Sequence, residues 1–317
     1  MIELRHVTKR YGAALAIDDL SLLVRRGECV VLLGPSGSGK STALRLINRL
    51  VDADAGQVLF DGRDVREQPA AALRRQMGYV IQSTGLFPHW TVARNIATVP
   101  QLLGWPKARI AARVDELLAL LGLDPGLAPR YPHQLSGGQQ QRVGVARALA
   151  AQPQVLLMDE PFGALDPLTR HGLQGELLRI HRMQGQTIVL VTHDIDEALR
   201  LATRIVLLDR GRLVQAATPA ELLRRPANAW VADFLGRDQA ALRLLALRCV
   251  GDAVRPGAVP EAGGVAATAG PALLQTQSLR EALAAFLAHG VDRLPVADAQ
   301  GTIVGMLHLA DLMQPVP

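Results

Sequence analysis

Cysteine and long apolar runs are scarce in this sequence of 317 residues. The two cysteines, Cys29 and Cys249, lie far apart in no metal-binding spacing, so we expect no disulfide framework, and a reducing compartment fits the chain. No stretch approaches the ~20 uninterrupted apolar residues of a membrane-spanning helix. The first twelve residues carry charges where a signal peptide needs an apolar core. We therefore expect any membrane role to be performed from outside the bilayer.

Aromatic residues are also few, and the charge is nearly balanced. Aromatics make up 3% of the chain and all hydrophobic residues 49%, so aliphatic side chains must fill most of the core. The net charge of +5 is spread thinly, without the basic stripe and interleaved aromatics of a nucleic-acid binder, so no nucleic-acid partner is expected. The length suits two domains, which we place at residues 1–236 and, with a linker, at 237–317.

Hydrophobic periodicity predicts an α/β fold. Three continuous apolar runs suit strands buried on both faces: residues 29–33, 155–158 and 187–191. Residues 2–24 alternate as β structure, and apolar residues from 43 to 50 have helical spacing. Between about 83 and 153 the pattern indicates a helical insertion. The apolar face of this insertion consists of Val114, Leu117, Leu118 and Leu121. Buried strands alternating with helices indicate a mainly parallel sheet covered on both sides.

A glycine-rich motif follows the first apolar run. Residues 34–42 read GPSGSGKST and match the P-loop pattern, with a strand before the motif and a helix after it. The glycines let backbone N–H groups point at phosphate, Lys40 brings a positive charge to the β- and γ-phosphates, and Ser41 offers its hydroxyl to Mg²⁺. The residues that we expect to hold ATP with Mg²⁺ are Gly34, Pro35, Ser36, Gly37, Ser38, Gly39, Lys40, Ser41 and Thr42.

Two adjacent carboxylates, Asp159 and Glu160, follow the second apolar run. Adjacent side chains diverge at the end of a strand, so one can face a metal ion while the other faces an attacking water. We assign Asp159 to Mg²⁺ and Glu160 to the role of general base or water-orienting group. Together with the P-loop, this pair indicates a P-loop NTPase.

The stretch LSGGQQQR at residues 135–142 resembles the signature motif of ABC ATPases. The resemblance covers residues 1 to about 235 and implies roles for four further residues. These are Tyr11 as the aromatic that stacks on adenine, Gln82 as the catalytic and metal-contacting glutamine of the Q-loop, Asp166 in the D-loop (Ala164–Asp166), and His193 as the catalytic switch histidine near the γ-phosphate.

The signature motif also predicts a homodimer. Ser136 and the two glycines after it open a helix, whose N-terminus suits an anion. The helical insertion separates this N-terminus from the P-loop of the same chain. We therefore expect the nucleotide-binding residues Ser136, Gly137, Gly138 and Gln139 to complete the γ-phosphate site of a second copy.

Residues 79–89 and 230–236 resemble the importer branch that takes up osmoprotectants such as glycine betaine, carnitine, choline or proline. That resemblance implies an integral-membrane permease, an extracytoplasmic substrate-binding protein, and a peripheral position at the cytoplasmic face of the membrane. Leu86–Pro88 is the segment that we expect to dock against the permease. The alternatives are an importer for another small solute, an exporter, and a soluble ABC protein of translation or DNA repair. The last class typically carries two cassettes or a long coiled-coil insertion, and this chain has neither.

The tail is expected to form a small α+β domain. After a linker rich in glycine, alanine and proline at residues 250–271, an amphipathic helix and two strand-like segments resemble a single CBS motif. CBS motifs work in pairs, so we expect two tails to pair across the homodimer. The contact is expected to involve Leu279, Leu283, Phe286 and Leu287. CBS motifs that bind adenosine phosphates commonly carry Ser or Thr where this chain has His308, so weak or no nucleotide binding is expected there.

Overall fold

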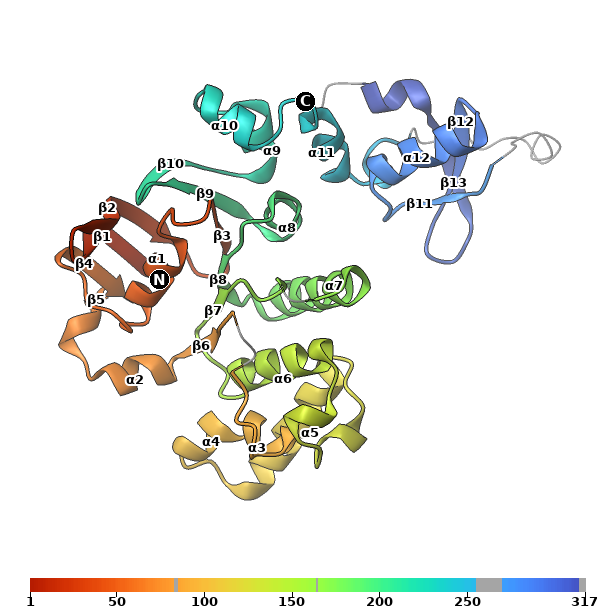
Figure 1. Ribbon diagram of the computed structural model, residues 1–317. Helices are drawn as coiled ribbons and strands as arrows, with labels where there is room; N and C mark the ends of the chain where they lie inside the picture. The colour runs from red at the N-terminus through yellow and green to blue at the C-terminus, as the bar shows by residue number, and fades with distance from the viewer. Residues whose placement is uncertain (83–84, 164, 255–269, 314–317) are drawn as a thin grey trace. The chain divides into compact units, whose positions relative to one another are not determined.

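The computed structural model describes residues 1–82, 85–163, 165–254 and 270–313. The chain divides into two compact units, Met1–Thr218 and Pro219–Pro317 (Figure 1). The domain boundary placed at residue 236 from composition stays a prediction. Among the helices of the described ranges, none is long and apolar enough to cross a membrane.

A six-stranded sheet forms the centre of the first unit. Its strands lie in the order β10-β9-β3-β8-β7-β6, and all neighbours are parallel except β9 and β10. The strands are β3 (Cys29–Leu33), β6 (Met77–Val80), β7 (Val155–Asp159), β8 (Thr187–Val191), β9 (Arg204–Asp209) and β10 (Arg212–Ala217). β3, β7 and β8 are buried along their whole length, as their apolar runs predict. The predicted mainly parallel sheet is confirmed.

A separate antiparallel sheet has the order β2-β1-β4-β5. Its strands are β1 (Ile2–Tyr11), β2 (Ala14–Val24), β4 (Ala55–Phe60) and β5 (Arg63–Asp64). The sequence predicts β structure at residues 2–24 but not this second sheet, because β1 also pairs with the distant β4. One hydrophobic core joins side chains of both sheets with those of helix α1 (Lys40–Ile47), which packs on β2, β4, β7 and β8.

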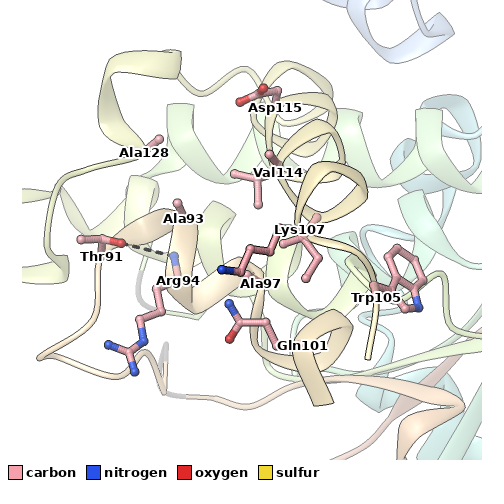
Figure 2. A pocket seen from close by; sticks show the side chains of 12 residues that line it. Thr91, Ala93, Arg94, Ala97, Gln101, Trp105, Lys107, Val114, Asp115 and Ala128 are labelled. Carbon is pink, nitrogen blue, oxygen red and sulfur yellow. Dashed lines mark hydrogen bonds between the residues drawn. The ribbon is translucent and has the colours of Figure 1, made fainter. Parts of the chain in front are cut away.

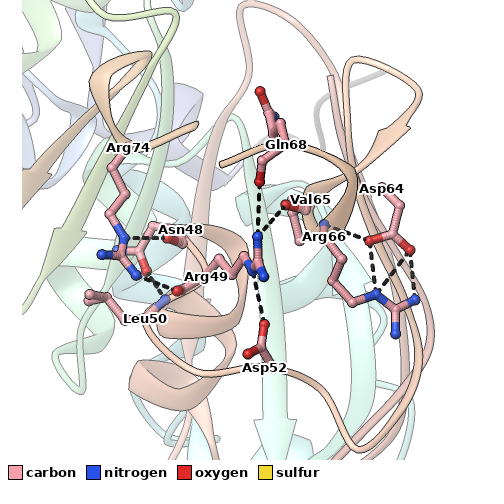
Figure 3. Close-up of polar contacts among 9 residues, drawn as sticks. All are labelled: Asn48, Arg49, Leu50, Asp52, Asp64, Val65, Arg66, Gln68 and Arg74. Carbon is pink, nitrogen blue, oxygen red and sulfur yellow. Dashed lines mark hydrogen bonds and ion pairs between the residues drawn. The ribbon is translucent and has the colours of Figure 1, made fainter. Parts of the chain in front are cut away.

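Helix α1 ends before Leu50, the last residue that helical spacing predicts on it, and Leu50 is 45% exposed. Arg49 terminates the helix with a left-handed φ of 52°. Its guanidinium donates to the Gln68 carbonyl oxygen at 2.9 Å, and Arg74 donates to that of Asn48 at 3.2 Å (Figure 3). These bonds attach the end of the P-loop helix to the segment around α2 (Ala70–Arg75).

The helical insertion lies between β6 and β7 (Figure 1). Its helices are α3 (Val92–Ile96), α4 (Thr98–Leu102), α5 (Lys107–Leu120) and α6 (Gly137–Leu149). The four residues of the predicted apolar face are all buried against their neighbours. Two further helices, α7 (Pro167–Gln184) and α8 (Ile195–Leu201), follow β7 and β8.

The second unit contains three helices and then the predicted α+β tail. Its elements are α9 (Pro219–Arg224), α10 (Ala229–Phe234), α11 (Ala240–Ala246), β11 (Leu273–Leu274), α12 (Leu279–His289), β12 (Arg293–Ala297) and β13 (Ile303–His308). The three strands form one sheet in the order β11-β12-β13. The expected helix and both strands of the CBS-like motif are therefore present.

Two expectations for the tail need correction. The predicted linker begins too early, since Val250 is fully buried in the core of this unit; residues 255–269 lie outside the described ranges. Leu279 and Phe286, which we expected at a contact between two tails, are 0% and 2% exposed inside the same core. The reason is that this unit buries one face of α12 against its own sheet. Leu287 is 74% exposed.

Candidate nucleotide site

Strand order brings four motif-bearing segments to one edge of the parallel sheet. The P-loop follows β3, His193 follows β8, Asp159 ends β7 just before Glu160, and Gln82 follows β6. These strands are neighbours in the order β3-β8-β7-β6. Because the carboxyl ends of parallel strands share one edge, residues that are far apart in the sequence meet there.

Glycine is required at both ends of the P-loop by close backbone approach. A Cβ atom would lie 2.1 Å from the Leu208 carbonyl oxygen at Gly34 and 2.5 Å from the Ala16 carbonyl oxygen at Gly39. Gly39 has a φ of 98° and precedes α1, whose N-terminus has no side-chain cap. The first N–H groups of that helix therefore lack intrahelical partners and suit phosphate oxygens.

The Lys40 ammonium lies within the P-loop. The residue is 6% exposed, and its Nζ donates to the carbonyl oxygens of Gly34 and Pro35, both at 2.8 Å. Burial lowers the pKa of Lys40, whereas the carboxylates of Glu160 and Asp159 act in the opposite direction. Lys40 in the P-loop and the carboxylates at the end of β7 thus place opposite charges at the same edge of the sheet.

Ser41 and Asp159 form a pair that suits Mg²⁺. Ser41 Oγ donates to Asp159 Oδ1 at 2.7 Å, and Asp159 is 4% exposed. Hydroxyl and carboxylate oxygens are ligands that Mg²⁺ prefers, and this ion commonly completes its shell with water and substrate phosphate. No cluster of three or more His, Cys, Asp or Glu side chains suited to a metal occurs in the described residues. The chemistry of this oxygen pair therefore fits an ion that takes few protein ligands.

Glu160 lies between Gln82 and His193. Gln82 Nε2 donates to Glu160 Oε2 at 3.0 Å, and His193 Nδ1 lies 3.2 Å from Glu160 Oε1. The Glu160 backbone has a φ of 45°, a left-handed conformation that costs a non-glycine residue on the order of 1 kcal/mol. Its N–H donates to the Val191 carbonyl oxygen at 3.0 Å, which fixes this turn against β8. Two of the residues predicted to be catalytic, Gln82 and His193, thus contact the third, Glu160.

The remaining predicted nucleotide residues lie elsewhere. Ser136 caps α6, accepting from Gln139 N, and Asp166 caps α7, accepting from Thr169 N at 3.1 Å. Tyr11, at the end of β1, is 45% exposed. Within the described ranges, no hydrogen bond or ion pair joins these side chains to the P-loop, so their nucleotide roles stay predictions. Ala164, which belongs to the predicted D-loop, lies outside the described residues.

The two caps are held close together. At Gly138, near the start of α6, a Cβ atom would lie 2.4 Å from Thr169 Cγ2, near the start of α7. A side chain at residue 138 would therefore displace Thr169 or α7, because ordinary van der Waals contacts between carbon atoms are about 3.5–4 Å. The start of the signature helix therefore packs directly on the first turn of α7.

Sequence reasoning missed two residues that hold the Phe87 segment (Leu86–Pro88). Asn95 is fully buried, its Oδ1 accepts from Phe87 N at 2.8 Å, and its Nδ2 donates to the Phe87 carbonyl oxygen at 3.1 Å. Arg147 on α6 donates to the Gly85 carbonyl oxygen at 2.6 Å, and its guanidinium lies 5.9 Å from the Phe87 ring centroid. Neither residue stands in a recognisable motif, so no local signal could have found it. Ser83 and Thr84, which were part of the predicted Q-loop segment, lie outside the described residues.

Comparison with known proteins agrees with this arrangement. A family model described as ABC transporter matches residues 17–163, and one described as CBS domain matches residues 270–316. The dimeric structure of the bacterial ABC transporter cassette MJ0796 aligns with a TM-score of 0.64 and 35% sequence identity, covering 69% of this chain and 99% of that one. The fold and site thus define a nucleotide-binding cassette.

Two curated relatives support the same family, and one of them matches along nearly the whole chain. The glycine betaine uptake system ATP-binding protein YehX of Escherichia coli is 58% identical over 99% of both chains. The glycine betaine/carnitine/choline transport ATP-binding protein OpuCA of Bacillus subtilis is 50% identical over 75% of this chain and 63% of its own length. The chain therefore belongs to the family of ABC transporter ATP-binding proteins, and it carries a C-terminal CBS domain.

Proposed function

We propose that the chain hydrolyses ATP with Mg²⁺ as a homodimer and thereby powers import of a quaternary amine of the glycine betaine type through a separate permease. The observation that supports this most directly is the contact of Glu160 with both Gln82 and His193, at the sheet edge that carries the P-loop. The names of the full-length and partial relatives support the substrate class.

The chemistry assigns a distinct task to each residue. The uncapped N-terminus of α1 and the Lys40 ammonium bind the phosphates, while Ser41 and Asp159 would hold Mg²⁺, which neutralises phosphate charge when bound. Glu160 orients a water molecule or accepts its proton. Gln82 and His193 hold the two oxygens of that carboxylate, which limits the directions it can take.

Support for the homodimer comes from predicted nucleotide-binding residues that are exposed. Within the described residues, their side chains make no hydrogen bond or ion pair with the P-loop of their own chain. Ser136 and the start of α6 form a capped but exposed helix N-terminus, which suits an anion brought by another molecule. Tyr11 and Asp166 are exposed as well. The dimeric cassette structure of a 35% identical protein supports this assembly.

The permease is proposed to dock on the helical insertion. A groove of about 660 Å³ lies among α3, α4 and α5 (Figure 2). Its lining includes Arg94, Trp105 and Val114. The Arg94 guanidinium lies 4.4 Å from the Trp90 ring centroid, and that ring packs on Phe87 at 4.4 Å between centroids, so Arg94 links the lining of the groove to the Phe87 segment. Phe87 is 39% exposed, which leaves an apolar ring available to a partner.

Substitution of Phe87 by aspartate tests this docking. Phe87→Asp is expected to leave the ATPase activity of the isolated subunit intact while abolishing co-purification with the permease, because a charge would replace apolar contact area. Leu50→Asp is the matched control, since Leu50 is similarly exposed but lies at the end of α1. If the isolated Phe87→Asp subunit lost its ATPase activity together with its co-purification, the substitution would have misfolded the chain, and the docking role would be contradicted.

Uptake by cells tests the substrate class. The proposed import function also implies an extracytoplasmic substrate-binding protein and a position of this chain at the cytoplasmic face of the membrane. A strain that lacks this chain should lose uptake of radiolabelled glycine betaine, choline or carnitine at high osmolarity and regain it with the wild-type chain. It should not regain uptake with Glu160→Gln. Unchanged uptake of all three amines in the deletion strain would refute the substrate class.

A further inference from the structure

Glu197 on α8 is a buried carboxylate outside the site described above. It is 7% exposed, its Oε2 accepts from Thr192 Oγ1 at 2.6 Å, and its Oε1 accepts from Gln174 Nε2 at 3.3 Å. Burial raises the pKa of Glu197; the Thr192 hydrogen bond lowers it, the Asp194 carboxylate raises it, and Arg170 and Gln174 lower it. Burying a carboxylate costs free energy unless hydrogen bonds compensate. The partners that supply those hydrogen bonds are therefore the groups that Glu197 holds in place.

Thr192 carries the first of these contacts to the backbone at His193. Thr192 is 2% exposed, and its N–H donates to the Leu32 carbonyl oxygen at 3.2 Å, on the strand that leads into the P-loop. Its hydroxyl accepts from Asp194 N at 3.0 Å while donating to Glu197. His193 stands between Thr192 and Asp194, so both ends of the backbone that carries the imidazole are anchored.

The second contact leads to helix α7. Gln174 is 3% exposed and belongs to that helix, as does Arg170. Arg170 Nη2 donates to the Leu165 carbonyl oxygen at 3.1 Å, and its Nη1 lies 3.8 Å from Asp194 Oδ2. The guanidinium also approaches Glu197 Oε1 at 4.0 Å. One polar cluster therefore joins the turn at His193 to the residue that precedes the α7 cap.

We propose that Glu197 is a positioning residue for ATP turnover, which holds the His193 turn through Thr192 and joins it to the start of α7 through Gln174 and Arg170. Glu197 does not touch the reacting atoms. It acts by restricting where the imidazole can lie relative to Glu160. The inference rests on the proposed function, because it requires His193 to contribute to turnover.

Kinetics of the full-length chain test this role. Glu197→Ala is expected to lower kcat by about tenfold or more while the Kd for ATP changes by less than about threefold, since the P-loop contacts are untouched. In a His193→Ala background the same change should have little further effect on kcat, because the group that Glu197 positions is gone. A residue that only stabilised the fold would give the same loss in both backgrounds.

Thr192→Val supplies a second variant in case Glu197→Ala folds poorly. It removes only the hydroxyl that links the turn to Glu197 and should also lower kcat. Thr187→Val is the matched control: Thr187 is 3% exposed at the start of β8, the strand that Thr192 follows, and its hydroxyl accepts from Gly27 N at 3.0 Å. This control should lower the unfolding temperature but leave kcat near the wild-type value.

The outcomes separate this inference from the proposed function. A reduced kcat in His193→Ala, with near wild-type kcat in Glu197→Ala and Thr192→Val, would overturn the positioning role alone. Wild-type kcat in His193→Ala would overturn both the proposed role of His193 and the inference that depends on it. Equal losses of kcat in Thr192→Val and Thr187→Val would show a general effect of strand stability and would also overturn the positioning role.

Discussion

Replacement of Glu160 by glutamine tests the proposed chemistry most directly. The substitution keeps the size of the side chain and its place between Gln82 and His193, and it removes the negative charge and the basic oxygen. General base catalysis contributes about 10²- to 10⁴-fold to turnover, so kcat should fall by that factor, equivalent to about 3–5 kcal/mol of barrier. ATP affinity should stay equal or rise, because the Glu160 carboxylate lies near Lys40 and would repel the nucleotide phosphates.

Phosphate release and binding of a fluorescent ATP analogue measure the two effects separately. Glu67→Gln is the matched control, since Glu67 is an exposed glutamate remote in the sequence from the strands that build the site. Bound ATP should also shift the variant toward the dimer in size-exclusion chromatography. Turnover within about threefold of the wild-type rate would refute the assignment of Glu160. Loss of ATP binding together with turnover would instead indicate damage to the P-loop.

Three other predictions concern binding, reactivity and stability. Lys40→Ala should weaken ATP binding itself in a calorimetric titration, because it removes the cation inside the P-loop; unchanged affinity would contradict its role. Burial raises the pKa of the Cys29 thiol to about 12, so at pH 8 iodoacetamide should modify only Cys249 in the folded chain and both cysteines after denaturation, as mass spectrometry can show. Phe286→Ala should cost about 3–5 kcal/mol of stability in the second unit, with Leu287→Ala as an exposed control, and equal unfolding temperatures would refute the proposed core.

The sequence predicted best what contiguous residues determine. The P-loop, the acidic pair at the end of β7 and the three buried strands all depend on short patterns, and the structure has each of them. The antiparallel sheet was missed because its pairing joins Ile2 to Phe60 across the P-loop and α1. The end of α1 was missed because Arg49 adopts a left-handed conformation, which apolar spacing does not reveal.

Single polar residues that fix a neighbouring segment were the other class that the sequence could not reveal. Asn95, Arg147 and Glu197 each fix a loop or turn near a predicted functional segment, but each stands within a helix among ordinary helical neighbours. Their partners are set by the fold, as with Arg147 and the Gly85 carbonyl oxygen, which are 62 residues apart. Conversely, Leu279 and Phe286 were correctly identified as apolar, but apolar character alone does not distinguish a domain's own core from a contact with another copy.

The lack of a side chain at Gly138 lets the start of α6 approach the start of α7 closely. A side chain there would force Thr169 into another rotamer or separate the start of α6 from the start of α7. Ser136 and Asp166 cap these two helices, so the close approach of Gly138 to Thr169 places both caps near one contact between the helices. A second copy of the chain that approached this contact would meet both caps together.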